Sequence, residues 1–119
     1  MKVALLGATA KSDRYAYKAL EKLIEKEHKV YPIHPKMEFL LGKKVYSSIS
    51  EIDVDIDTLT LYVGKARSDI MIDEIIALNP RRIIFNPGAE NDLLRDKAKA
   101  AGIEALYACT LVMLTTGQF

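Results

Sequence analysis

Apolar runs of strand length alternate along this chain with segments whose apolar residues recur at helical spacing. Residues 2–6 are almost wholly apolar and end at Gly7, which is typical of a strand buried on both faces. Over residues 13–27 the apolar positions recur every three or four residues, which predicts a helix with Ser12 as its N-cap. Residues 29–33 then predict a second strand.

The same alternation continues to residue 107. The further elements expected are a short edge strand over 44–46, a strand over 57–63, a helix over 66–78, a strand over 82–85, a helix over 90–101 and a strand over 104–107. Gly102 is well placed to end the last of these helices. The apolar residues 111–114 follow no clear period and leave two alternatives open, packing on the domain or on a neighbouring copy in a homo-oligomer.

Strands that alternate with helices imply right-handed βαβ units and a parallel sheet with helices on both faces. We therefore expect an α/β protein with a Rossmann-like, doubly wound parallel sheet in three α/β/α layers. The 119 residues suit one domain, so we expect a single domain over residues 1–119.

Composition and charge narrow the function classes. Half of the residues are apolar and 28% are charged, as in ordinary globular proteins, and the net charge of +1 creates no field that attracts nucleic acid or membranes. Cys109 is the one cysteine, so no internal disulfide and no zinc cluster is expected. The apolar run before Gly7 is too short for a signal peptide. We expect a soluble, cytoplasmic protein with no nucleic-acid or membrane partner.

Loops with unusual residues follow several of the expected strands. They are Gly7-Ala8-Thr9, His34-Pro35-Lys36, Val63-Gly64-Lys65 and Asn86-Pro87-Gly88. In an open parallel sheet, ligands bind beyond the carboxyl ends of the strands, where the strand order reverses. This convergence predicts a site for a small nucleotide-type ligand.

The first of these loops combines small residues with a following helix. Ala8, Thr9 and Ala10 are small, Thr9 and Ser12 offer hydroxyl groups, and Lys11 and Arg14 offer positive charge. The free N–H groups at the start of a helix favour phosphate. A single glycine also serves simply to make a turn, and the full G-x-G-x-x-G fingerprint is absent, because Thr9 and Ser12 stand where its later glycines would fall.

The loop after the second strand discriminates among nucleotides. A classical NAD domain has an acidic residue there that grips the ribose. This chain has His34-Pro35-Lys36 instead, with no acid before Glu38. A lysine suits a ligand with an extra phosphate on the adenosine ribose, so coenzyme A and NADP both fit and NAD is disfavoured. Lys36 as a solvated turn residue is the plain alternative.

Several segments match a known family in order along the chain. They are 3–9 (VALLGAT), Arg14-Tyr15, 31–36 (YPIHPK), 41–43 (LGK), 85–91 (FNPGAEN) and 108–110 (ACT). This combination resembles the stand-alone CoA-binding domain family, which is similar to the Rossmann-like N-terminal domain of the succinyl-CoA synthetase α subunit. Two departures stand out. His34 replaces the family's usual Asn, and Gly64-Lys65-Ala66-Arg67 stands where the family often has arginines.

The resemblance implies a set of contacts. Residues 9–12 would cradle the phosphates of CoA, and Lys36 would meet the adenosine 3′-phosphate. Val63 to Lys65 would line the pantetheine or the adenine, and Asn86-Pro87-Gly88 would border the same cleft. The catalytic phosphohistidine of the synthetase lies in a second domain, so that chemistry does not carry over to these residues.

No constellation of residues indicates catalysis. His28 suits a helix C-terminus, His34 a loop contact, and Cys109 a small buried position, with a meeting between its thiol and that of CoA as the alternative. The acidic residues 53–57 suit capping and solubility rather than a metal site. The interpretation we favour is therefore a non-catalytic module that binds CoA or an acyl-CoA, as a sensor or as the partner of a separate enzyme. The alternatives are an NADP-linked oxidoreductase and an interaction protein without a ligand.

Overall fold

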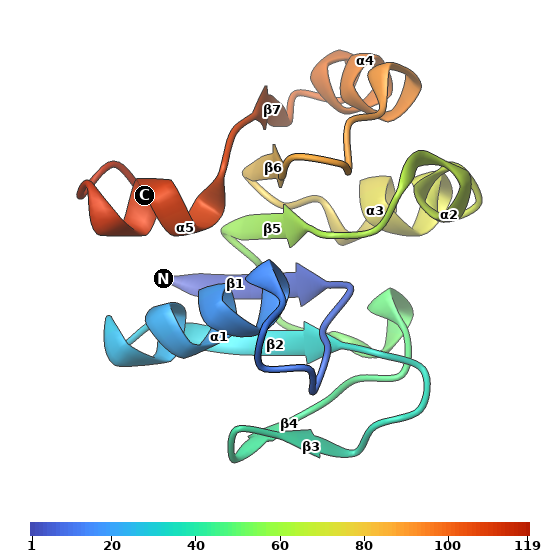
Figure 1. The fold of residues 1–119 in the computed structure, drawn as a ribbon. Coiled ribbons are helices and arrows are strands. Elements are labelled where there is room, and N and C mark those ends of the chain that lie inside the picture. The colour runs from blue at the N-terminus through green and yellow to red at the C-terminus, as the bar shows by residue number, and fades with distance from the viewer.

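A five-stranded parallel sheet forms the centre of the computed structural model, which describes residues 1–119 (Figure 1). Its strands are β1 (Lys2–Leu6), β2 (Lys29–Ile33), β5 (Thr58–Leu61), β6 (Arg82–Phe85) and β7 (Glu104–Tyr107), in the order β2-β1-β5-β6-β7. The chain steps from β1 to one side for β2 and returns to the other side of β1 for β5. The order therefore reverses between β1 and β5, as in doubly wound folds.

Helices cover both faces of this sheet. They are α1 (Tyr15–Glu25), α2 (Lys65–Asp69), α3 (Ile72–Leu78), α4 (Asp92–Ala100) and α5 (Thr110–Thr115), with a 3₁₀ turn η1 at Ile49–Glu51. One apolar core joins the sheet to α1 and α5, and the other joins it to η1, α3 and α4 (Figure 1). This three-layer arrangement confirms the predicted Rossmann-like α/β fold.

Strand β1 shows why the apolar runs form the middle of the sheet. Val3 and Leu5 point into the core under α1 and α5, whereas Ala4 and Leu6 point into the opposite core. All four side chains are at most 3% exposed, so a continuous apolar sequence is what this position requires. Truncation of such a leucine to alanine typically costs about 2–5 kcal/mol.

Three local expectations need correction. The helix predicted over 66–78 is two helices, because the amide of Met71 bonds to the carbonyl of Ser68 and α3 restarts from Met71. Ser12 does not cap α1, since a turn between Lys11 and Arg14 delays the helix to Tyr15. The expected edge strand over 44–46 is a small antiparallel hairpin, β3 (Phe39–Leu40) and β4 (Lys43–Lys44), followed by a single bridge at Tyr46.

The apolar tail packs on the domain as helix α5. Leu114 is 3% exposed and lies in the same core as Leu20 and Leu23 of α1. Leu114 therefore packs on the domain itself, whereas Val112 of the same helix is 56% exposed. No helix of the structure combines the length and the apolar content that crossing a bilayer demands.

Candidate functional site

Two clefts open at the edge of the sheet where β1, β2 and β5 end. The larger, of about 780 Å³, is lined by Gly7, Thr9, Lys11, Arg14, Tyr15, Ala16, His34, Tyr62, Asn86, Pro87, Cys109, Leu111 and Val112. The smaller, of about 340 Å³, is lined by Leu6, Gly7, Ala8, Thr9, Ile33, His34, Pro35, Ser47, Ser48, Ile49, Tyr62, Arg67, Met71 and Glu74. Both volumes lie in the range of small-molecule sites. Because Gly7, Thr9, His34 and Tyr62 belong to both clefts, the two form neighbouring parts of one crevice.

Gly7 is fixed by packing at the point where the strand order reverses. Its φ is +98°, and a Cβ there would lie 3.0 Å from the backbone carbon of Tyr62 and 3.1 Å from Cγ1 of Val63. Only glycine lets the exits of β1 and β5 approach this closely. The turn therefore requires this glycine for the fold itself, whatever binds beside it.

The loop after Gly7 leaves several backbone donors without a partner beside the crevice. The amide of Ala8 is used by the sheet, where it donates to the carbonyl of Ile33 at 3.2 Å. The amide of Lys11 donates to Oγ1 of Thr9. The amides of Thr9, Ala10, Ser12 and Asp13 donate to no protein acceptor, and α1 adds the free amides of its first turn. Such a loop, leading into a helix N-terminus, suits an anion.

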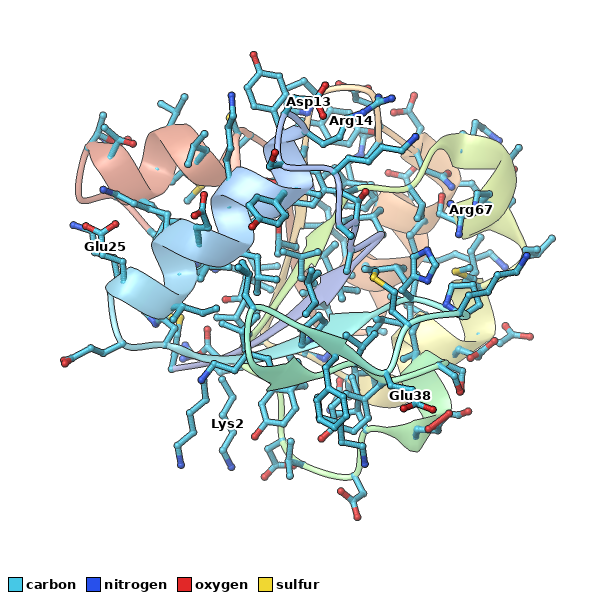
Figure 2. The ribbon with its side chains drawn as sticks, turned by 60° about the horizontal axis from the view of Figure 1, so that its bottom comes forward. Lys2, Asp13, Arg14, Glu25, Glu38 and Arg67 are labelled. Carbon is cyan, nitrogen blue, oxygen red and sulfur yellow. The ribbon has the colours of Figure 1, made fainter.

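Two cations accompany these donors. Lys11 and Arg14 both line the larger cleft, and neither makes an ion pair within the protein. Figure 2 shows Arg14 beside Asp13 at the start of α1. Asp13 lines neither cleft, so the wall of the larger cleft beside this loop carries positive charge.

His34 keeps the turn after β2 in shape. Its Nδ1 accepts a hydrogen bond of 3.0 Å from the amide of Lys36, two residues further on. An asparagine side chain makes the same kind of bond in an Asx turn, which gives the replacement of the family's usual Asn by His34 a physical reason. With Nδ1 occupied as an acceptor, Nε2 carries the proton of the neutral ring and is its free donor. Pro35 lines the smaller cleft, whereas Lys36 is exposed and lines neither cleft.

Tyr62 forms part of both clefts, and the sequence analysis missed it. Its side chain packs on the core beneath α1 and α5, and its hydroxyl is buried without a hydrogen-bond partner. Burial, with a smaller contribution from Cys109, raises the pKa of Tyr62 to about 12, so the hydroxyl keeps its proton at neutral pH. Its position in the sequence could have indicated this role, because Tyr62 directly follows β5, the strand that pairs with β1.

Asn86 links β5 to α5 through side-chain hydrogen bonds at the base of the larger cleft, and we call this set of bonds the Asn86 bracket. It is 1% exposed, and its Nδ2 donates to Oγ1 of Thr60 at 2.8 Å and to the carbonyl of Leu61 at 2.9 Å. Its Oδ1 accepts a bond of 2.8 Å from the amide of Thr110, the first residue of α5. Asn86 thereby ties the start of α5 to β5 and positions one wall of the cleft.

Some of the expected contact residues lie outside both clefts. These are Ala10, Ser12, Lys36, Val63, Gly64, Lys65 and Gly88. Val63 is 2% exposed and belongs to the core, so its side chain is not part of a binding surface. Lys65 forms an ion pair with Asp69 at 2.8 Å. Val63, Gly64 and Lys65 therefore do not line the smaller cleft, but Arg67 of α2, a few residues further on, does.

Comparison with known proteins identifies the family. The family model described as "CoA binding domain" matches residues 1–115. The chain belongs to this CoA-binding domain family, which confirms the resemblance read from the sequence. A trans-feruloyl-CoA synthase from an unknown prokaryotic organism is 28% identical over 118 residues, which is 92% of this chain and 16% of that protein. The ADP-forming acetate–CoA ligase of Methanocaldococcus jannaschii is 33% identical over 61 residues, which is 51% of this chain.

A solved structure shares the fold of the chain. A crystal structure of an uncharacterized protein superposes with a TM-score of 0.90 at 39% identity, covering 99% of this chain and 97% of that one. The curated relatives are much longer, since this chain spans only 16% and 9% of their lengths. The NADP alternative raised by Lys36 finds no support in these matches.

Proposed function

We propose that this chain binds coenzyme A, free or acylated, as a non-catalytic module at the crevice beyond β1, β2 and β5. The observation that carries the proposal is the segment from Thr9 to Arg14, whose unpartnered amides and two unpaired cations lie at the larger cleft. Membership of the CoA-binding domain family supports CoA over other nucleotides. The pyrophosphate of CoA is the anion that this loop would hold.

The two clefts suit the two ends of this ligand. The larger cleft ends at Leu111 and Val112 of α5, so it suits the pantetheine arm and an acyl group. The smaller cleft carries the charged Arg67 and Glu74, so it suits the more polar adenosine. We therefore propose that CoA lies across Gly7 and Thr9, with its adenosine toward β2 and its thiol toward α5.

The polar groups of the crevice favour holding a ligand over transforming it. The side chain of Asn86 is committed to the bracket between β5 and α5. The hydroxyl of Tyr62, with a pKa of about 12, stays protonated near neutral pH and is a poor general base there. The curated relatives are named as a CoA synthase and a CoA ligase. We propose that this chain serves as a CoA sensor or as the partner of a separate enzyme that makes or uses CoA thioesters.

A thermal-shift titration with CoA, dephospho-CoA, NADP and NAD tests the ligand. A ligand that binds only the folded state at 100 times its Kd adds about 2.7 kcal/mol of stability. For a domain of this size we expect a rise in Tm of roughly 10 °C with CoA and a smaller rise with dephospho-CoA. A larger shift with NADP than with CoA would contradict the proposal, and no shift with any of the four would favour the interaction-protein alternative.

The variant Thr9→Glu tests the place of the phosphates. A carboxylate at this position repels a pyrophosphate held by the neighbouring amides, so CoA affinity should fall by about 100-fold or more. Thr115→Glu is the matched control, because Thr115 is an exposed threonine of α5 that lines neither cleft. Isothermal titration calorimetry measures both, with circular dichroism to verify folding. Unchanged affinity in a folded Thr9→Glu variant would place the ligand elsewhere.

A further inference from the structure

The smaller cleft holds a cation that the fold leaves without a partner. Arg67 lies in α2 and lines this cleft, and it makes no ion pair within the protein. The other cation of the same helix, Lys65, is neutralised by Asp69 at 2.8 Å and lies outside the cleft. Figure 2 shows Arg67 projecting from the edge of the domain where α2 lies. Arg67 is therefore the guanidinium available to an anionic ligand in this cleft.

The remaining polar groups of the cleft fit a nucleoside that carries a phosphate. His34 lines the same cleft and has Nε2 as its free donor, since Nδ1 is bonded to the amide of Lys36. Glu74 of α3 is the acid of the cleft and makes no ion pair, so it can accept hydrogen bonds from ribose hydroxyl or adenine amino groups. One cation and one acid in a space of about 340 Å³ suit a group with both a phosphate and neutral donors.

We propose that Arg67 determines specificity by binding the 3′-phosphate of the adenosine of CoA, in place of the lysine that the sequence suggested. This inference rests on the proposed function. Lys36 is exposed on the turn and lines neither cleft, whereas Arg67 lines the cleft beside the proposed pyrophosphate site. A guanidinium also binds a phosphate through two parallel hydrogen bonds, which an ammonium group cannot do.

Calorimetric titration of CoA and dephospho-CoA into the wild type and four variants tests this assignment. The wild type should bind CoA with an affinity about 10-fold or more higher than its affinity for dephospho-CoA. A tenfold ratio corresponds to about 1.4 kcal/mol. Arg67→Gln should reduce the preference to less than about threefold and leave the affinity for dephospho-CoA unchanged. Lys65→Gln, on the same helix, should keep the wild-type preference, and Arg67→Lys should be intermediate because it retains only the charge.

The two ligands separate failure of this inference from failure of the proposed function. Binding of dephospho-CoA by the wild type reports on the crevice as a whole, and the ratio of the two affinities reports on Arg67. A full preference in Arg67→Gln, or its loss in Lys36→Gln, would overturn the assignment of Arg67 while CoA binding stands. A wild type that binds neither ligand would overturn both. Arg67 is exposed, so its variants should unfold at the wild-type temperature, which a thermal melt verifies.

Discussion

Replacement of Gly7 by alanine tests whether the reversal point of the sheet is as tightly packed as the structure indicates. The added Cβ would meet the backbone carbon of Tyr62 at 3.0 Å and the Cβ of Tyr62 and Cγ1 of Val63 at 3.1 Å. The nearest of these atoms is backbone and cannot rotate away. The two strand exits must therefore separate, and such overpacking typically costs about 1–3 kcal/mol.

Backbone strain adds to this cost and must be measured separately. An L-residue at a φ of +98° is strained by about 1–2 kcal/mol, so Gly7→Ala should lose roughly 2–5 kcal/mol in all. Gly88 is the matched control, because its φ is +91° and an added Cβ would meet nothing within 4 Å. Gly88→Ala should therefore show the strain alone, about 1–2 kcal/mol.

Urea unfolding followed by circular dichroism gives both free energies, and thermal melts provide a second measurement. A domain of this size loses about 4 °C of Tm per kcal/mol, so the two variants should differ by roughly 4–12 °C. Equal destabilisation of Gly7→Ala and Gly88→Ala would show that the exits of β1 and β5 accommodate a Cβ at position 7 without separating. The packing argument for Gly7 would then fail, and the glycine would have to be explained by the turn alone.

Three further predictions follow from particular contacts. Asn86→Ala should lose about 3–5 kcal/mol in urea unfolding, because it leaves the buried amide of Thr110 and other groups of the bracket without partners. A hydrogen bond from Thr58, and then the guanidinium of Arg81, lower the pKa of Asp57. The ionised carboxylate therefore stabilises the fold above about pH 4, and this stability is lost as the pH falls through its lowered pKa. The stability gap between wild type and Asp57→Asn should thus narrow from pH 6 to pH 3, and a constant gap would contradict this. Val112→Trp should fill the end of the larger cleft. Calorimetry should then show an affinity for CoA that is about 10-fold lower (about 1.4 kcal/mol) and an unchanged affinity for adenosine 3′,5′-bisphosphate.

The inner strands β1 and β6 were predictable because both of their faces are buried, and the edge strands β2 and β7 because short apolar runs recur between the helices. Strands buried on both faces are nearly continuous apolar runs. The bounds expected for β1, β2, β6 and β7 agree with the structure. Helix α5 was not predictable from period, because six residues span fewer than two turns. It is held by tertiary contacts instead, namely the bond from Thr110 to Asn86 and the packing of Leu114 near α1.

The candidate site was predictable at the level of loops and less so at the level of side chains. The carboxyl ends of parallel strands share one edge, so Gly7, His34 and Asn86 meet there as expected. Arg67 was overlooked as a residue of the smaller cleft because a continuous helix over 66–78 gave no reason to single out its orientation. Val112 was missed because it depends on the fold of the tail.

The reversal of strand order links the packing of this domain to its proposed selectivity. Because β1 lies between β2 and β5, its exit divides the crevice into two clefts of different chemistry. In the proposed arrangement, the backbone amides beside this loop would bind the pyrophosphate of any nucleotide and so would favour nucleotides in general. Discrimination among nucleotides would then come from the two clefts, through the charge of Arg67 in the smaller and the apolar residues of α5 in the larger. Under the proposed arrangement, a ligand with a phosphorylated adenosine and a long, weakly polar arm would satisfy both clefts, and CoA has both parts.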